Sequence, residues 1–145
     1  MHPFPHHYPV TATANKDSNV RLTAPGIAAI KSAGPVEFGG PGDLWSPESL
    51  LCAAVADCFV LSFRAIARAA RFEWEDLKCD VVGTLDKVDR VTRFTGFEVS
   101  AHLTLAAGAD EAKAIKLLEK AEHSCLITNS LTAPSHLTCE IEFTE

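Results

Sequence analysis

Residues 46–71 (SPESLLCAAVADCFVLSFRAIARAAR) form a long, mostly apolar stretch that predicts one long helix. Three residues at its start favour a helix N-terminus. Ser46 can cap the helix, Pro47 suits the first helical position, and Glu48 places a negative charge in the first turn, where the helix dipole favours it. We therefore expect the helix to begin here.

The interior of this helix is apolar around nearly its whole circumference. Between Leu50 and Phe63 the only polar residues are Asp57 and Ser62, which is typical of a helix that is buried on nearly all sides. The charges within the stretch argue against a membrane span; they are Asp57, Arg64 and Arg68. We expect the central helix of a soluble protein.

Alternating apolar and polar residues predict five strands. They are residues 8–14, 20–23, 74–88, 95–105 and 137–143. The first two flank a polar turn and predict a hairpin. The third and fourth flank Asp89-Arg90 and predict a long antiparallel pair with one solvent-exposed face. On the later strands we expect these residues to point inward: Cys79, Val81, Leu85, Phe97, Val99, Ala101, Leu103, Leu105, Leu137, Cys139, Ile141 and Phe143.

The remaining segments complete an α+β pattern. Residues 24–44 are rich in glycine and proline and predict a loop, with one short strand at 36–38. A second helix is expected from Glu111 to about Ser124, capped by Asp110, with a buried stripe of Ala114, Leu118, Ala121 and Cys125. The order of hairpin, helix, hairpin, helix and strand indicates an α+β class, in a single domain of residues 1–145.

Charge and composition exclude several classes of protein. The chain has 145 residues, a net charge of −6 and no basic run, which argues against a nucleic-acid-binding protein. Its start, MHPFPHHYPV, lacks the apolar core of a signal peptide, and no other stretch could cross a membrane. We expect a cytoplasmic protein that binds neither nucleic acid nor a membrane.

Five cysteines are present, without the spacing of a disulfide framework. Cys52, Cys79 and Cys139 fall among apolar neighbours and are interpreted as small buried hydrophobes. Cys58 and Cys125 have polar neighbours and are candidates for thiol chemistry. A zinc site is the other option, because the spacings His123-x-Cys125 and His136-x-x-Cys139 suit metal ligands, although structural zinc sites usually contain tighter cysteine pairs.

Two motifs stand out: Ser46-Pro47-Glu48 with the apolar helix that reaches Cys58-Phe59, and Cys125 followed by Ile127 and Asn129. In these motifs, and from about Tyr8 to its end, the chain resembles the OsmC/Ohr family, the osmotically inducible and organic-hydroperoxide-resistance proteins. A β-hairpin and a helix separate the two motifs, as in the family.

The resemblance implies an OsmC-like, intertwined homodimer, with antiparallel sheets around a long buried central helix and a second helix. It implies a thiol-dependent peroxidase in which Cys58 attacks the peroxide, Cys125 resolves the product as a disulfide, and Glu48 organises the site. The implied partners are an organic hydroperoxide, a dithiol reductant and a second copy of the chain, with no metal or cofactor. The alternative is a small-molecule-binding or structural dimer without peroxidase activity.

Activation of Cys58 is the open chemical question. The residue lies in mid-helix, too far from the N-terminal dipole, so a cation is expected to lower its pKa. Glu48 lies roughly 15 Å away along the helix axis and could serve the site only across a dimer interface. The family places an activating arginine in the first hairpin turn or the loop before the central helix. Neither contains one here, and Arg21, near the turn, is the candidate.

The chain also departs from the family pattern. Asp57 replaces a small residue, and its carboxylate would raise the thiol pKa unless Arg64, about two turns on, pairs with it. Leu126 stands where many members have proline. Phe59 and Phe63 are expected to line an apolar pocket near Cys58. These departures indicate a divergent member.

Overall fold

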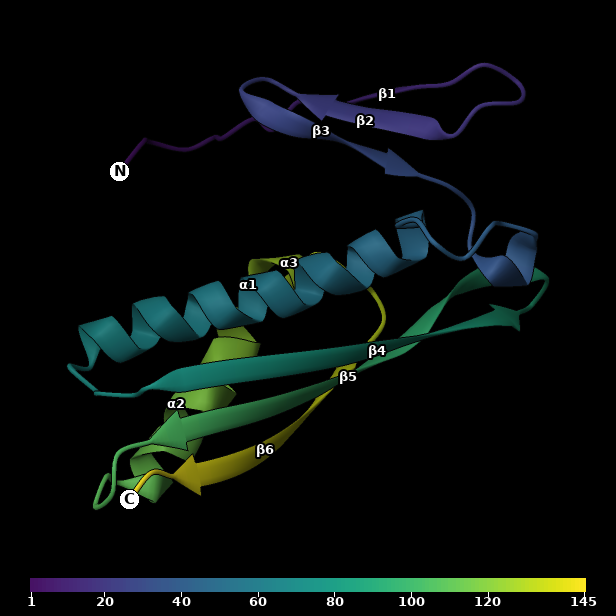
Figure 1. Cartoon of the computed structure of the whole chain (residues 1–145). Coiled ribbons are helices and arrows are strands. Elements are labelled where there is room, and N and C mark those ends of the chain that lie inside the picture. The colour runs from purple at the N-terminus through teal and green to yellow at the C-terminus, as the bar shows by residue number, and fades with distance from the viewer. The chain divides into compact units, whose positions relative to one another are not determined.

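A computed structural model describes residues 1–145. The chain forms two compact units, residues 1–50 and 51–145, and each is described by itself. The expectation of a single domain stays a prediction. The α+β class is confirmed, because two three-stranded sheets accompany the helices (Figure 1).

The first unit contains an antiparallel sheet in the order β1 (Thr11–Thr13), β2 (Val20–Ala24) and β3 (Ile27–Ser32). The predicted hairpin corresponds to β1 and β2, but β3 lies in a segment that the sequence indicated to be loop. Pro25 and Gly26 connect β2 to β3 in a tight turn, and Gly26 has the positive φ of 74° that glycine tolerates without strain. The short strand expected at residues 36–38 is wrong: Val36–Phe38 is a 3-10 helix, η1.

The long helix, α1, runs from Pro47 to Ala69. Its start is fixed as the sequence predicts. The Ser49 N–H donates to Ser46 Oγ at 3.1 Å, and the Ser46 N–H donates back to Ser49 Oγ at 2.8 Å, so both serines satisfy backbone groups at the helix start.

The second unit continues with β4 (Asp76–Val88), β5 (Val91–Leu105), α2 (Glu111–Ser124), α3 (Leu126–Asn129) and β6 (Ser135–Phe143). Central strand β5 pairs antiparallel with β4 and parallel with β6. Asp89 and Arg90 both have positive φ and make the tight turn between β4 and β5. As predicted, Asp110 caps α2 by accepting from the Lys113 N–H at 3.0 Å.

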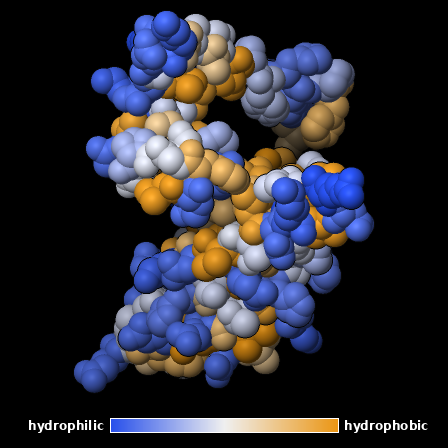
Figure 2. Space-filling view, turned by 90° about the vertical axis from the view of Figure 1, so that its right-hand side faces the viewer, coloured by the Kyte–Doolittle hydropathy of each residue, from blue (hydrophilic) through white to orange (hydrophobic).

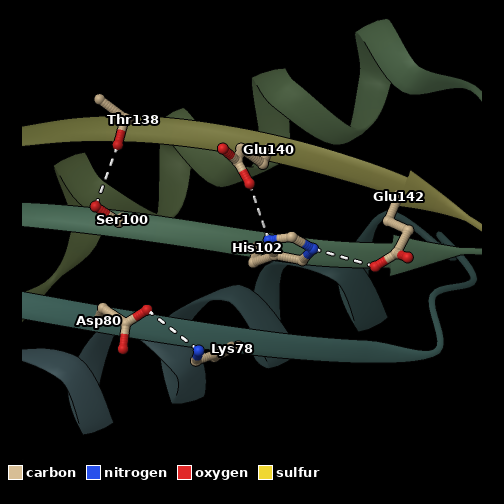
Figure 3. Close-up of polar contacts among 7 residues, drawn as sticks. All are labelled: Lys78, Asp80, Ser100, His102, Thr138, Glu140 and Glu142. Carbon is tan, nitrogen blue, oxygen red and sulfur yellow. Dashed lines mark hydrogen bonds and ion pairs between the residues drawn. The ribbon is translucent and has the colours of Figure 1, made fainter.

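One face of this sheet is polar and the other is apolar, and the helices α1 and α2 cover the apolar face (Figure 1). The five predicted inward residues of β5 are buried, as is the predicted stripe of α2. Phe143, by contrast, is 41% exposed, because it lies at the end of an edge strand. On the polar face His102 contacts Glu140 and Glu142, each at 3.1 Å (Figure 3).

Helix α1 buries only one stripe within a single chain, made of Val55, Phe59, Phe63 and Ala67. Leu61 is 50% exposed, and apolar residues reach the surface of the isolated chain (Figure 2). The expectation of a helix buried nearly all round is therefore not met by one chain.

Length and composition alone would allow α1 to cross a membrane, so its charges do not exclude a span as the sequence suggested. Core helices of globular proteins meet the same criterion. Its buried stripe packs with the sheet into one hydrophobic core, as expected of a core helix.

Gly83, in the middle of β4, allows close packing between the sheet and α1. A Cβ atom at this position would lie 2.7 Å from Cys52 Sγ, 2.8 Å from Phe94 Cε1 and 3.0 Å from Phe97 Cε1. We expect Gly83→Ala to lower the free energy of unfolding by about 1–3 kcal/mol, because overpacking strains a dense core. Urea denaturation measures this change.

Gly96→Ala on β5 is the matched control. Its Cβ would meet only the Pro134 carbonyl oxygen, at an ordinary 3.7 Å, so stability should stay the same or rise slightly. If both variants lose the same free energy of unfolding, the loss comes from the backbone of strand glycines and the close contact with Cys52 contributes nothing.

Candidate functional site

Cys58 and Cys125 meet in the second unit. Cys58 lies in the middle of α1 and is half-buried, whereas Cys125 is 2% exposed and lies between α2 and α3. The Cys125 side chain lies near enough to the Cys58 sulfur to help lower the pKa of that thiol. Both thiols are free, so the structure shows the pair in its reduced form.

Cys125 is held by the break between two helices. Its N–H donates to the Glu122 carbonyl at 3.3 Å as α2 ends, and its own carbonyl accepts from the Asn129 N–H at 3.0 Å as α3 begins. The Thr128 hydroxyl donates to the same carbonyl at 3.1 Å. With Cys125 in an extended conformation, φ −65° and ψ 107°, the first N–H groups of α3 are left without helical partners.

Two of these N–H groups contribute to the pKa of Cys58. Burial is the largest single influence and raises the pKa, but hydrogen bonds from the Ile127 N–H, the Cys125 thiol, the Ser62 hydroxyl and the Leu126 N–H together lower it below its ordinary value. The Ser62 oxygen lies 3.9 Å from the Cys58 sulfur. Within one chain the lowered pKa therefore has hydrogen-bond donors as its cause, and the expectation that a cation also lowers it stays a prediction.

Glu48 lies in the first turn of α1, as predicted. Its Oε1 atom is buried and has no hydrogen-bond partner. A buried carboxylate without a partner is costly, so this oxygen is suited to accept a donor that the single chain does not supply. Its role in the site stays a prediction.

Arg21 lies on β2, in the first unit, and is exposed. Its direct partner across the sheet is Lys31, and it forms no ion pair. Its action on Cys58 stays a prediction.

One further expectation is wrong. Asp57 and Arg64 are both exposed and form no ion pair with each other. Phe59 and Phe63 both lie in the hydrophobic core, where the Phe63 ring packs edge-on against Trp74 at 5.4 Å between centroids, and their lining a pocket stays a prediction. They point toward the sheet because they continue the buried stripe of α1.

The other three cysteines pack against the hydrophobic core, as interpreted from the sequence. Burial, with smaller contributions from the charges of Asp80 and Cys125, raises the pKa of Cys79 to about 11. Burial also raises the pKa of Cys139, together with Glu119 and Glu122. Both groups are therefore neutral thiols at physiological pH and poor nucleophiles.

The zinc option loses its support, because no three side chains of histidine, cysteine, aspartate or glutamate are grouped closely enough to hold a metal ion. Sequence reasoning also missed three donors to Cys58. Ser62 could have been found from its i+4 spacing on the helix. The N–H groups of Leu126 and Ile127 carry no such signal, because any non-proline residue supplies one.

Comparison with known proteins agrees with this architecture. The family model of the OsmC-like proteins matches residues 40–140. The chain belongs to the OsmC-like family. Among curated proteins it is 29% identical over 109 residues to the uncharacterized protein YmaD of Bacillus subtilis, covering 73% of each chain.

Solved structures show the same fold. An OsmC-like protein of unknown function from Vibrio cholerae superposes with a TM-score of 0.83 at 20% identity, over 94% of this chain and 99% of the other. The organic hydroperoxide resistance protein OsmC from Legionella pneumophila gives a TM-score of 0.75 at 23% identity, over 97% and 99%. OhrB of Bacillus subtilis, also an organic hydroperoxide resistance protein, gives 0.65 at 19% identity, over 96% and 98%.

Proposed function

We propose that this protein is a thiol-dependent peroxidase that reduces organic hydroperoxides with Cys58 and Cys125. One observation carries the proposal: the pKa of the Cys58 thiol is lowered, and a second thiol, Cys125, lies near enough to be one of the causes. A nucleophilic thiolate beside a resolving thiol is what a two-cysteine peroxidase requires. Structural neighbours named for organic hydroperoxide resistance support the choice of substrate.

The proposed reaction balances with the hydroperoxide as the oxidant and thiols as the reductants. The Cys58 thiolate attacks one peroxide oxygen and the O–O bond breaks, which yields a Cys58 sulfenic acid and an alkoxide that takes up a proton to become an alcohol. The Cys125 sulfur then attacks the sulfenic acid and releases water, leaving a disulfide. A dithiol reductant finally exchanges with this disulfide, becoming oxidised itself and restoring both thiols.

A second copy of the chain is part of the proposal. In one chain, α1 leaves apolar residues at the surface and Glu48 Oε1 has no hydrogen-bond partner. A partner chain would cover these apolar residues. It would also supply a donor to Glu48, and Arg21 is the candidate for that donor. We expect light scattering to give twice the mass of 15.6 kDa at micromolar concentration. A measured mass of one chain would contradict both the proposed dimer and the proposed role of Glu48.

Intact mass spectrometry tests the function directly. After one equivalent of cumene hydroperoxide, the wild-type protein should become about two mass units lighter through one disulfide, and a dithiol should reverse the change. Peptide mapping should place the disulfide between Cys58 and Cys125. A protein that stays reduced while peroxide persists would instead be a dimer with inert thiols.

A further inference from the structure

The first unit contains an open groove of about 560 Å³ beside the β1–β2 turn. It is lined by Thr13, Ala14, Asn15, Ser18, Asn19, Val20, Arg21 and Lys31. This volume is in the range of small-molecule sites. The lining contains two cations and several hydroxyl and amide groups, and no acidic residue.

The two cations lie directly opposite each other. Arg21 on β2 and Lys31 on β3 are Cα partners, and Thr13 on β1 is the partner of Arg21 on the other side, so all three side chains lie on one face of the sheet. Like charges at directly opposed positions destabilise a sheet. No carboxylate relieves the repulsion: neither cation forms an ion pair, and Asp17, the acid of the turn, does not line the groove.

The turn leaves free donors beside these cations. Asn15 Oδ1 accepts from the N–H groups of Asp17 and Ser18 at 2.8 Å each, which leaves its NH₂ group unused. Ser18 Oγ accepts from the Asn15 N–H at 3.0 Å and retains its own O–H. These bonds hold the turn in shape without using the donors that a bound anion would need.

We propose that this groove binds the phosphate group of a small molecule between Arg21 and Lys31. The planar guanidinium can donate two parallel hydrogen bonds to phosphate oxygens, the ammonium adds a point charge, and the turn supplies neutral donors. Bound phosphate would also remove the repulsion between the two cations. The site uses no thiol, and it assigns the Arg21 guanidinium to a phosphate in place of Glu48 of a partner chain.

Amide NMR spectra of the whole protein, recorded at constant ionic strength, test the site with inorganic phosphate, phenyl phosphate, acetate and chloride. Saturable shifts at Asn19, Arg21 and Lys31 are expected with either phosphate and not with acetate or chloride. Tighter binding of phenyl phosphate would indicate a phosphate ester, and equal or weaker binding would indicate free phosphate; both support the site. Acetate binding as tight as that of phosphate, or no saturable shift, would overturn the proposal.

Charge variants separate the site from general attraction. Lys31→Gln and Arg21→Gln should each weaken phosphate binding about tenfold, the effect of losing a hydrogen bond to a charged group. Lys16→Gln, which removes a positive charge from the β1–β2 turn outside the groove, should change binding less than twofold. Arg21→Lys keeps the charge and should still lose affinity, because the paired hydrogen bonds are gone. Equal effects of Lys16→Gln and Lys31→Gln would overturn the site.

Discussion

Cys58→Ser should abolish peroxide consumption, because the hydroxyl that replaces the thiol is not a nucleophile at neutral pH and the three core cysteines lack the donors that surround Cys58. Cys125→Ser should instead keep the first chemical step, so one turnover should still occur and a sulfenic acid should persist at Cys58. Under excess peroxide that species should oxidise further to sulfinic and sulfonic acids. Stopped-flow kinetics and intact mass spectrometry follow both steps.

Cys79→Ser is the matched control for these two variants. Its thiol is half-buried near Cys125, and its pKa is raised to about 11, so its loss should leave peroxide consumption intact even if stability falls. The function fails if both active-site variants consume peroxide as fast as the wild type does. If only Cys79→Ser loses activity, the peroxidase chemistry belongs to Cys79 and the proposed roles of Cys58 and Cys125 are wrong.

Leu126→Pro should raise the pKa of Cys58 and slow its reaction with peroxide about two- to tenfold at pH 7, because proline removes one N–H donor to the sulfur. The backbone should tolerate the change. Leu126 is the first residue of α3, a favourable position for proline, and the extended conformation of Cys125 is compatible with a following proline. The side chain is 65% exposed, so little packing is lost.

The pH profile identifies the cause. A lowered pKa means that the wild-type thiolate persists to lower pH, so the proline variant should require higher pH for the same rate, and the two rates should converge once both thiols are ionised. Leu126→Ala retains the N–H and should titrate like the wild type. Ultraviolet absorbance of the thiolate against pH measures the shift. If the titration curves of all three proteins coincide, the Leu126 N–H does not lower the pKa of Cys58, and another group, such as a cation from a partner chain, must activate the thiol.

Local patterns predicted most of the second unit. The strict alternation from Phe97 to Leu105 corresponds to an observed buried face, and Asp110 caps α2 as its position before an amphipathic segment indicated. These features depend on neighbours within a few residues, which a sequence displays directly. The same reasoning failed for β3, where Pro25-Gly26 was interpreted as part of a loop although it makes the turn between two strands.

The site was predictable only in part. The thiols could be singled out because their types and neighbours were unusual, and the family resemblance paired them. Two of the hydrogen bonds that lower the pKa of Cys58 come from the backbone of a four-residue helix far along the chain. Backbone donors have no residue signature, and their placement depends on where α2 ends, so they emerge only from the fold.

The positions of the two thiols along the chain link oxidation to stability. A disulfide from position 58 to position 125 would close a loop of about 70 residues, which would restrict the unfolded ensemble by about 4 kcal/mol of chain entropy. The oxidised protein should then resist unfolding and proteolysis better than the reduced protein. Each catalytic cycle would therefore alternate between an oxidised form that is more stable to unfolding and a reduced form that is less stable. The reductant that restores activity would also restore susceptibility to degradation.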